Sequence, residues 1–167
     1  MEDIEGEIYI LGDDINTDDI VPSYTLTMRD PYEMAKHVLE FKEPNFTQKV
    51  AKRSIIVGGH NFGTGSSREE AVNVFKILGI KAIIAKSFSR IYFRNLINNG
   101  IAGIICDWDE ATFSDGDQVQ ISIENGMIFN KSKDLEITYE KLPIFLKKIL
   151  ESGGILNQLK EKLTQNQ

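Results

Sequence analysis

Residues 54–85 read SIIVGGHNFGTGSSREEAVNVFKILGIKAIIA, and this stretch decides the fold that we expect. The β-branched run 54–57 predicts a short buried strand, and the apolar run 82–85 predicts a second one. Between them, residues 67–78 carry apolar side chains at helical spacing, and this helix should end at Gly79. A strand, a helix and a strand in this order form a βαβ unit, so the two strands should be parallel and joined by a right-handed crossover.

The rest of the chain predicts further elements of the same kind. We expect strands at residues 5–11 and 102–106, a β-hairpin formed by 118–123 and 127–129 around Asn125-Gly126, an acidic loop at 12–19, and helices at 31–40, 88–99 and 143–163, the last broken at Gly153-Gly154. The chain has 167 residues, no internal repeat and no linker. Residues 1–167 therefore predict a single α/β domain with a parallel or mixed sheet flanked by helices.

Composition and charge exclude several classes of protein. The net charge of −6 argues against a nucleic-acid binder and against docking on anionic membranes, because both favour a basic face. No apolar run approaches the roughly 18 residues that a membrane span needs. The N-terminal residues MEDIEGE are acidic and lack the basic start and apolar core of a signal peptide, so we expect a cytoplasmic protein.

Cys106 is the single cysteine of the chain. One thiol cannot form an internal disulfide, a zinc site or an iron–sulfur site, because each of these needs several ligands. We therefore expect this chain to bind no metal by itself. Because Cys106 ends the apolar run IAGIIC, a buried core thiol is preferred over a reactive one.

The segment HNFGTGSSREE, residues 60–70, lies between the first strand of the βαβ unit and its helix. Free backbone N–H groups and the helix dipole favour anions at such a position, and glycines let the backbone approach a ligand closely. Arg68 adds a planar fork of donors that suits a carboxylate or a phosphate. The loop therefore predicts an anion-binding site that includes Ser66, Ser67 and Arg68.

A structural role for the two serines is the main alternative. Ser66-x-x-Glu69 and Ser67-x-x-Glu70 both match a capping box, in which the serine only caps the helix. Two glycines, tandem serines and an arginine together favour a ligand site, because a simple cap requires no arginine. A positive charge at a helix N-terminus is also mildly unfavourable for the helix itself.

Other sites fit the loop less well. Its order G-T-G-S-S lacks the G-x-S-x-G spacing of a nucleophile elbow, and no lysine completes a phosphate-binding P-loop. The chain has two histidines, and His37 falls in an expected helix, so a serine–histidine triad would depend on His60 alone. By themselves, Asp14, Asp18 and Asp19 indicate a solvated turn or a cation site.

At residues 60–70, which we call the glycine–serine loop, the sequence resembles the aconitase superfamily. Three stretches, in the order of the family, carry the resemblance: GDDINTD at 12–18, NFGTGSSRE at 61–69, and KSFSRI at 86–91, continuing to Arg94-Asn95. Ser89 stands where the family commonly has alanine. The length of the chain is similar to that of the free-standing small subunits of isopropylmalate dehydratase and homoaconitase, which correspond to the mobile fourth domain of aconitase.

The resemblance implies a swivel-type domain that acts as the small subunit of a hydro-lyase. Such an enzyme removes water from a hydroxy di- or tricarboxylic acid and adds it back at the neighbouring carbon. A large partner subunit would hold a 4Fe–4S cluster that binds the substrate hydroxyl, so activity would require both subunits. The substrate would be isopropylmalate, in leucine biosynthesis, or homoaconitate, in lysine biosynthesis.

By motif position, the resemblance also implies roles for four residues. Ser66 would be the base that takes a proton from the carbon next to a carboxylate. The helix N-terminus, backbone N–H groups and Arg68 would stabilise its alkoxide. Ser67 and Arg68 would bind a substrate carboxylate. Asp18 would orient a histidine of the large subunit.

Two departures from the family pattern concern Glu70 and the loop after Pro22. Glu70 replaces a histidine that often follows S-S-R-E, and it adds negative charge near the anion site. In the family, the loop after Pro22 distinguishes an apolar substrate branch from a carboxylate. Thr27 stands where homoaconitases carry arginine, so Thr27 and Met28 favour isopropylmalate, whereas an inward Arg29 would favour homoaconitate. We expect the polar residues of this loop to lack local partners.

A protein of another class stays open at this point. A non-catalytic anion-binding or regulatory domain could reuse the same loop, because fold alone does not imply function. The two hypotheses differ in what they require. The hydro-lyase needs a neighbouring gene for a large subunit that contains C-x-x-C and a distant third cysteine.

Overall fold

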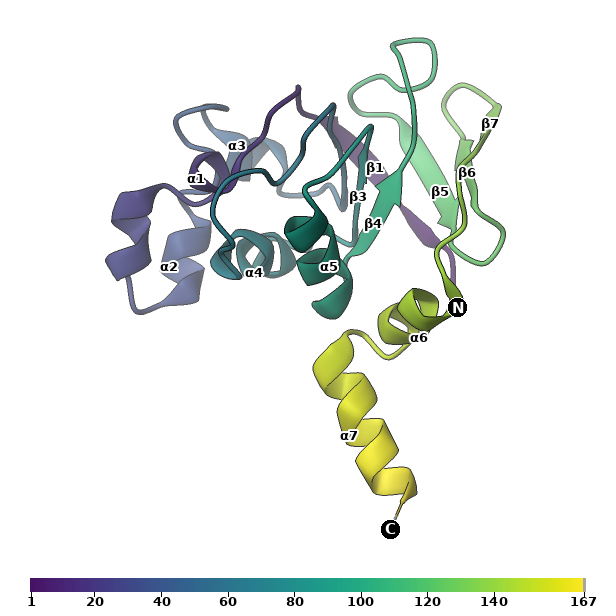
Figure 1. Cartoon of the computed structure of the whole chain (residues 1–167). Coiled ribbons are helices and arrows are strands. Elements are labelled where there is room, and N and C mark those ends of the chain that lie inside the picture. Colours follow the sequence, from purple (N-terminus) through teal and green to yellow (C-terminus); the bar gives the residue numbers. More distant parts are fainter. Residues whose placement is uncertain (167) are drawn as a thin grey trace.

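A seven-stranded mixed sheet forms the centre of the molecule in the computed structural model, which describes residues 1–166 (Figure 1). The strand order is β4-β3-β2-β1-β5-β6-β7. The strands are β1 (Ile4–Ile10), β2 (Ile55–Val57), β3 (Ala82–Ala85), β4 (Ala102–Ile105), β5 (Gln118–Ser122), β6 (Met127–Asn130) and β7 (Leu135–Thr138). Strands β1 to β4 pair in parallel, and β5 to β7 continue the sheet from β1 as an antiparallel meander.

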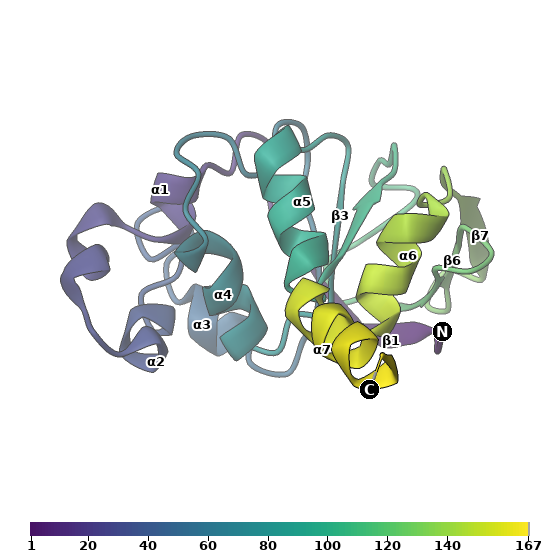
Figure 2. The same cartoon turned by 60° about the horizontal axis from the view of Figure 1, so that its bottom comes forward.

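Helices cover this sheet, and other helices lie beyond it at the ends of the molecule. They are α1 (Thr17–Ile20), the 3₁₀-helix η1 (Ser23–Thr27), α2 (Pro31–Ala35), α3 (Phe46–Lys49), α4 (Glu70–Ile77), α5 (Arg90–Asn98), α6 (Ile144–Glu151) and α7 (Ile155–Gln165). Figure 1 shows α1, α2 and α3 grouped at one end of the molecule, with α7 projecting from the body. Figure 2 shows α4, α5 and α6 in a row across the molecule. Among the described helices, none is long and apolar enough to cross a membrane.

The βαβ unit predicted from residues 54–85 is confirmed. Strands β2 and β3 are parallel, with Ile56 opposite Ile83, and α4 connects them. Every residue of both strands is buried, as expected for parallel strands that are covered on both faces. Helix α4, however, begins at Glu70 and not at Ser67. The two serines therefore belong to the loop.

Side chains alternate between two apolar clusters, one on each face of the sheet. Ile56 belongs to the first cluster together with Phe75 of α4, and Ile55 belongs to the second together with Ile149 of α6. Cys106 belongs to the second cluster, where burial raises the pKa of its thiol. The prediction of a buried core thiol is confirmed.

The predicted acidic loop 12–19 contains a helix, α1, that was not expected. The Asn16 side chain accepts a hydrogen bond from the Asp19 N–H at 2.8 Å, and the Asp19 carboxylate accepts one from the Asn16 N–H at 3.0 Å. This reciprocal capping box satisfies backbone donors at the start of a single turn. A turn with four charged or polar residues thus becomes an ordered helix, which fixes the positions of its side chains.

Three further elements differ from the predictions. Helix α2 ends at Ala35, and the chain continues as hydrogen-bonded turns to Glu40, where Leu39 has a left-handed φ of +56°. The short helix α3 was not expected. Strand β7 was not expected either, because its apolar–polar alternation, Leu-Glu-Ile-Thr, covers only four residues.

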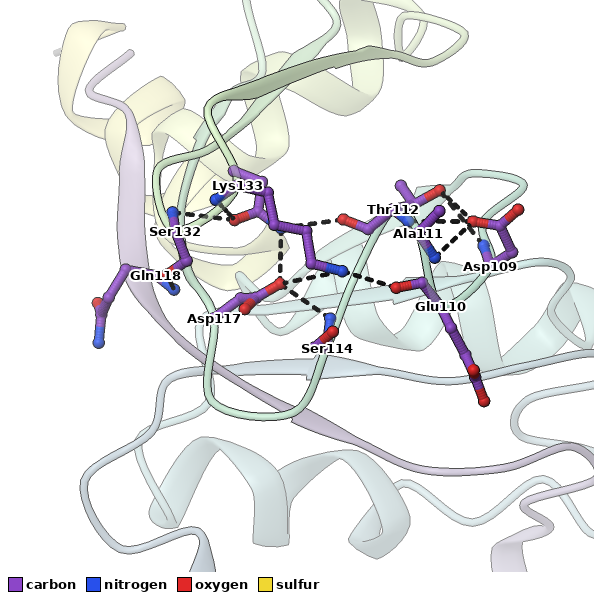
Figure 3. Close-up of polar contacts among 10 residues, drawn as sticks. Asp109, Glu110, Ala111, Thr112, Ser114, Asp117, Gln118, Ser132 and Lys133 are labelled. Carbon is purple, nitrogen blue, oxygen red and sulfur yellow. Dashed lines mark hydrogen bonds and ion pairs between the residues drawn. The ribbon is translucent and has the colours of Figure 1, made fainter.

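A buried polar cluster holds the loop between β4 and β5 (Figure 3). Asn130 is fully buried and donates from Nδ2 to the Asp117 carboxylate at 2.7 Å and to the Thr112 carbonyl at 2.9 Å. Asp117 also accepts from the Ser114 N–H at 2.8 Å. Because these buried groups have partners, the cluster stabilises the connection of the loop to β6. We assign it a structural role.

Candidate active site

The acidic segment 12–19 lies alongside the glycine–serine loop. The Thr17 N–H donates to the Thr64 carbonyl at 2.8 Å within an isolated parallel bridge. Close to it, the Gly63 N–H donates to the Ile15 carbonyl at 2.7 Å. The first two sequence motifs are therefore joined backbone to backbone.

The third motif pairs with the same loop. Phe62 and Phe88 form a second isolated bridge, in which the Phe62 N–H donates to the Ser87 carbonyl at 3.0 Å and the Ser89 N–H donates to the Phe62 carbonyl at 2.9 Å. The Ser87 hydroxyl accepts from the Asn61 N–H at 2.8 Å. Three motifs that are far apart in the sequence thus form one site.

Acidic side chains of segment 12–19 accept hydrogen bonds from residues of the glycine–serine loop. Asp13 accepts from the His60 N–H at 2.7 Å, and Asp14 accepts from the Asn61 side-chain amide at 3.0 Å. Across residues 1–166, no group of three His, Cys, Asp or Glu side chains is arranged to hold a metal ion. The His60 residue is exposed and is not part of the cavity lining. The cation site and the serine–histidine triad therefore find no support.

A small cavity of about 30 Å³ opens at the glycine–serine loop. Its lining combines all three motifs and includes Thr17, Ser66, Ser67, Arg68, Ser89 and Tyr92. The structure thus brings together the three loop residues that the sequence predicted as an anion site. Sequence reasoning missed Thr17, Ser89 and Tyr92 as lining residues, although the first two lie within the quoted motifs.

Neither serine caps the helix that follows. Glu69 occupies the N-cap position of α4, and no side chain accepts a hydrogen bond there. The capping interpretation of Ser66 and Ser67 is therefore wrong. Both residues are exposed at the cavity, so a ligand can reach their hydroxyls.

Gly65 has a backbone conformation that other residues rarely adopt. Its φ is +101°, and a Cβ at this position would lie 2.9 Å from the Thr17 Oγ1 atom. The absence of a side chain lets the loop approach α1 closely. This approach sets the position of Ser66, the next residue.

Arg68 forms an ion pair with Asp18 of α1. Its Nη1 atom lies 2.7 Å from Asp18 Oδ1 and donates to the Val21 carbonyl at 3.4 Å. The Arg68 side chain is 21% exposed and that of Asp18 is 61% exposed. Asp18 compensates the positive charge that would otherwise be unfavourable just before a helix. The remaining guanidinium donors of Arg68 are left for an anion at the cavity.

Tyr92 forms a buried part of the cavity wall. Its side chain is 2% exposed, and its hydroxyl donates to the Ala71 carbonyl at 2.8 Å. Burial raises the pKa of Tyr92 far above its ordinary value. The phenol therefore stays protonated at neutral pH and is not a candidate base.

Known proteins are similar to this chain in sequence and in fold. Residues 18–107 match the aconitase C-terminal domain. The chain belongs to this family. It is 40% identical to the 3-isopropylmalate dehydratase small subunit 1 of Methanopyrus kandleri, over 95% of this chain and 94% of the relative. It is 44% identical to the methanogen homoaconitase small subunit of Methanocaldococcus jannaschii, over 95% of this chain and 92% of the relative.

A solved structure extends the similarity to three dimensions. The crystal structure described as 3-isopropylmalate dehydratase from Methanocaldococcus jannaschii matches with a TM-score of 0.90 and 44% identity, over 98% of each chain. The resemblance to the aconitase superfamily is therefore confirmed, as is the mixed α/β fold. As in the sequence-based prediction, the sheet is flanked by helices.

The loop after Pro22, for which the family resemblance predicts a role in substrate choice, lies outside the cavity. In the structure it comprises η1 and the two residues that follow. Thr27, Met28 and Arg29 are not among the lining residues, so the structure does not bring these three predicted residues to Ser66. Arg29 is exposed, and Leu26 is 37% exposed.

The polar residues of η1 have local partners, contrary to our expectation. The Thr25 hydroxyl donates to the Pro22 carbonyl at 2.7 Å, and the Thr27 hydroxyl donates to the Tyr24 carbonyl at 3.1 Å. The Met28 N–H donates to the Thr25 carbonyl at 2.9 Å. All these hydrogen bonds lie within this chain, so η1 is ordered without a partner subunit.

Tyr24 ties η1 to the turns after α2. Its hydroxyl donates to the Glu40 carboxylate and lies 3.1 Å from Nδ1 of His37. That His37 nitrogen is also 2.9 Å from the second Glu40 oxygen. The hydrogen bond from Tyr24 lowers the pKa of Glu40, and the bond to Glu40 raises the pKa of Tyr24. The contact is therefore present throughout the neutral pH range.

Proposed function

We propose that this chain is the small subunit of an aconitase-type hydro-lyase that interconverts 2-isopropylmalate and 3-isopropylmalate. One observation carries the proposal: Ser66, Ser67 and Arg68 line one cavity, and both hydroxyls are free of the helix that follows. The similarity over nearly the whole chain to proteins named small subunits supports it. Such a name implies a large partner, so the active enzyme contains both subunits.

Ser66 is the proposed base. Its alkoxide takes a proton from the carbon next to a carboxylate, the C–H electron pair becomes the new C=C bond, and the C–O bond of the neighbouring carbon breaks. The hydroxyl leaves with that electron pair as hydroxide, which a Lewis acid of the large subunit would accept. The proton stays on Ser66 until rehydration returns it to carbon. Arg68 lines the same cavity, and its positive charge stabilises the Ser66 oxygen while that oxygen is charged.

Ser67 and Arg68 are proposed to bind a substrate carboxylate. A hydroxyl donor and a guanidinium at one cavity provide charge-assisted hydrogen bonds to such a group. Asp18 uses Oδ1 for Arg68 and is otherwise exposed. Its second oxygen is accessible to a histidine of the large subunit, which Asp18 would orient.

The 4Fe–4S cluster of such an enzyme is proposed to belong to the large subunit. A cluster needs several cysteine ligands, whereas Cys106 is the single cysteine of this chain and is buried in the core. The residues of this chain therefore do not fit a cluster. When bound in the partner, a cluster supplies the Lewis acid for the substrate hydroxyl. The part of this chain is to bind the carboxylate and to move the proton.

The chemistry of η1 favours an apolar substrate branch. Leu26 presents an exposed apolar side chain beside Thr27. Arg29 is exposed and, like Leu26 and Thr27, lies outside the cavity lining of the free chain. Homoaconitate is the second candidate substrate, because one relative with 44% identity is named a homoaconitase small subunit.

Reconstitution with the large subunit tests the proposal. The two chains are co-expressed, the cluster is reconstituted anaerobically, and turnover of isopropylmalate, homocitrate and homoaconitate is compared. We expect turnover from the complex and none from either subunit alone, with isopropylmalate preferred. A complex that forms but converts none of these acids would favour the non-catalytic anion-binding domain. Preferred conversion of homoaconitate would favour the second candidate.

A further inference from the structure

The side chain of Thr17 is buried without a hydrogen-bond partner. Thr17 is 1% exposed, and among the described residues its hydroxyl is the one buried side-chain polar atom that makes no hydrogen bond. A buried hydroxyl without a partner is unfavourable for the fold, because it has lost its hydrogen bonds to water. Such a group therefore needs an explanation.

The hydroxyl of Thr17 lies where the glycine–serine loop meets α1. It lines the same cavity as Ser66 and Arg68, and a Cβ at Gly65 would lie 2.9 Å from it. The Thr17 N–H is held by the Thr64 carbonyl at 2.8 Å. Figure 2 shows α1 beside the start of α4. The surroundings thus fix the hydroxyl next to the backbone that leads into Ser66.

Thr25 shows what an ordinary buried threonine does in this fold. It is 0% exposed, and its hydroxyl donates to the Pro22 carbonyl at 2.7 Å. The hydroxyl of Thr25 therefore stabilises the small subunit. Thr17 has the same burial but makes no such bond, so its hydroxyl does not serve the free fold.

We propose that Thr17 donates a hydrogen bond to the Ser66 oxygen in the assembled enzyme, a role that rests on the function proposed above. The hydroxyl of Thr17 stabilises the negative charge of the Ser66 alkoxide before that oxygen takes the proton from substrate carbon. In this step the new O–H bond forms on Ser66, the C–H electron pair becomes the C=C bond, and the C–O bond breaks to release hydroxide, which a Lewis acid of the large subunit would accept. Thr17 keeps its own proton throughout. Arg68 remains available for the substrate carboxylate.

Two substitutions in the reconstituted complex test this role. Thr17→Val keeps the shape and removes the hydroxyl, whereas Thr17→Ser keeps the hydroxyl and removes the methyl group. We expect Thr17→Val to lower kcat about 100-fold with KM for isopropylmalate changed by about twofold or less. Thr17→Ser should recover most of the lost kcat. A rise in KM with kcat unchanged, or equal losses in both variants, would overturn the role.

An isotope effect separates proton transfer from a structural effect. With substrate deuterated at the carbon that loses its proton, Thr17→Val should show a larger primary isotope effect on kcat than the wild type, because only proton transfer becomes slower. Thr17→Ser should show the wild-type value. An unchanged isotope effect in Thr17→Val would contradict the proposal.

The stability of the free small subunit provides the second readout. Thr17→Val should leave the midpoint of thermal unfolding unchanged or raise it, because it removes a hydroxyl without a partner. Thr25→Val is the matched control and should lower the midpoint, since its hydroxyl is bonded. A similar loss of stability in both variants would show that the Thr17 hydroxyl is structural. A wild-type complex without turnover would overturn the proposed function itself, and the role of Thr17 with it.

Discussion

The guanidinium of Arg68 and the carboxylate of Asp18 lie 2.7 Å apart, and this ion pair joins α1 to the glycine–serine loop. Asp18→Asn should lower turnover of the complex by about tenfold or more, because Arg68 loses the charge that orients it. The free energy of unfolding of the free subunit should change by less than about 1 kcal/mol, since Asp18 is largely exposed and such pairs are screened. Steady-state kinetics and thermal unfolding measure the two effects.

Arg68→Lys is the matched variant for that pair. It keeps the positive charge but loses the planar fork that can bind Asp18, the Val21 carbonyl and a carboxylate together. We expect KM for the substrate to rise by about 10- to 100-fold with a smaller change in kcat. An unchanged KM would contradict the assignment of Arg68 to the substrate carboxylate.

Ser66→Ala should abolish most turnover without harming the fold. Loss of the base should lower kcat at least about 100-fold in the complex. Because neither serine caps α4, the free energy of unfolding should change by no more than about 0.5 kcal/mol. Ser67→Ala is the control at the neighbouring exposed hydroxyl, and it should act mainly on KM. A Ser66→Ala complex with near-normal kcat would leave Ser66 without a catalytic role.

Gly65→Ala should disturb both the fold and the site. Its φ of +101° and the contact of 2.9 Å with Thr17 Oγ1 both oppose a Cβ, so we expect a loss of roughly 1–3 kcal/mol of stability. Gly79→Ala is the control, because Gly79 has a φ of +83° but no atom within 4 Å of the added Cβ. Both variants should unfold at lower denaturant concentration than the wild type, but only Gly65→Ala should also lower kcat of the complex. Equal kcat in the two variants would argue against the close approach of the loop to α1 as a catalytic requirement.

Arg29→Ala separates the two candidate substrates. Arg29 is exposed, and an exposed arginine contributes little, so isopropylmalate turnover should change by about threefold or less. The reciprocal variant Thr27→Arg introduces a cation at the position where the family resemblance places an arginine in homoaconitases. It should raise homoaconitate turnover relative to isopropylmalate, measured as the ratio of kcat/KM values. A loss of 10- to 1,000-fold on homoaconitate in Arg29→Ala, on the order of that expected for a lost buried pair, would show that Arg29 binds the substrate.

The contact between Tyr24 and Glu40 should give η1 a defined pH dependence. The pKa of Glu40 is lowered by the bond from Tyr24, so the contact contributes stability above the ordinary carboxyl pKa and loses it as the pH falls through the lowered value. Exchange of the Met28 amide hydrogen, which reports on η1, should therefore become less protected only below the ordinary pKa of a glutamate carboxyl. Tyr24→Phe should reduce the protection already at neutral pH, whereas Tyr32→Phe at an exposed position should not. Equal protection in wild type and Tyr24→Phe would mean that the contact does not hold the loop.

The sequence predicted the residue types of the site better than their arrangement in space. Ser66, Ser67 and Arg68 are adjacent, so their shared chemistry is visible in a single loop, and their common cavity followed as expected. The ion pair of Arg68 with Asp18 was not predicted, because the two residues come from different motifs and meet only when the chain folds. The capping boxes at the same serines were misleading, since a pattern of serine and glutamate does not state where the helix begins.

By itself, the sequence determined the βαβ unit of residues 54–85, the hairpin at Asn125-Gly126 and the family, because apolar periodicity, turn residues and motifs are local properties of the chain. Only the tertiary structure decided that α1 forms, that β7 pairs with β6, and that residues 27–29 lie outside the cavity. It also decided that the hydroxyl of Thr17 stays without a partner. The physical reason is that α1 and β7 are short elements with weak local patterns, whereas the cavity joins segments that are far apart in the sequence and meet only when the chain folds.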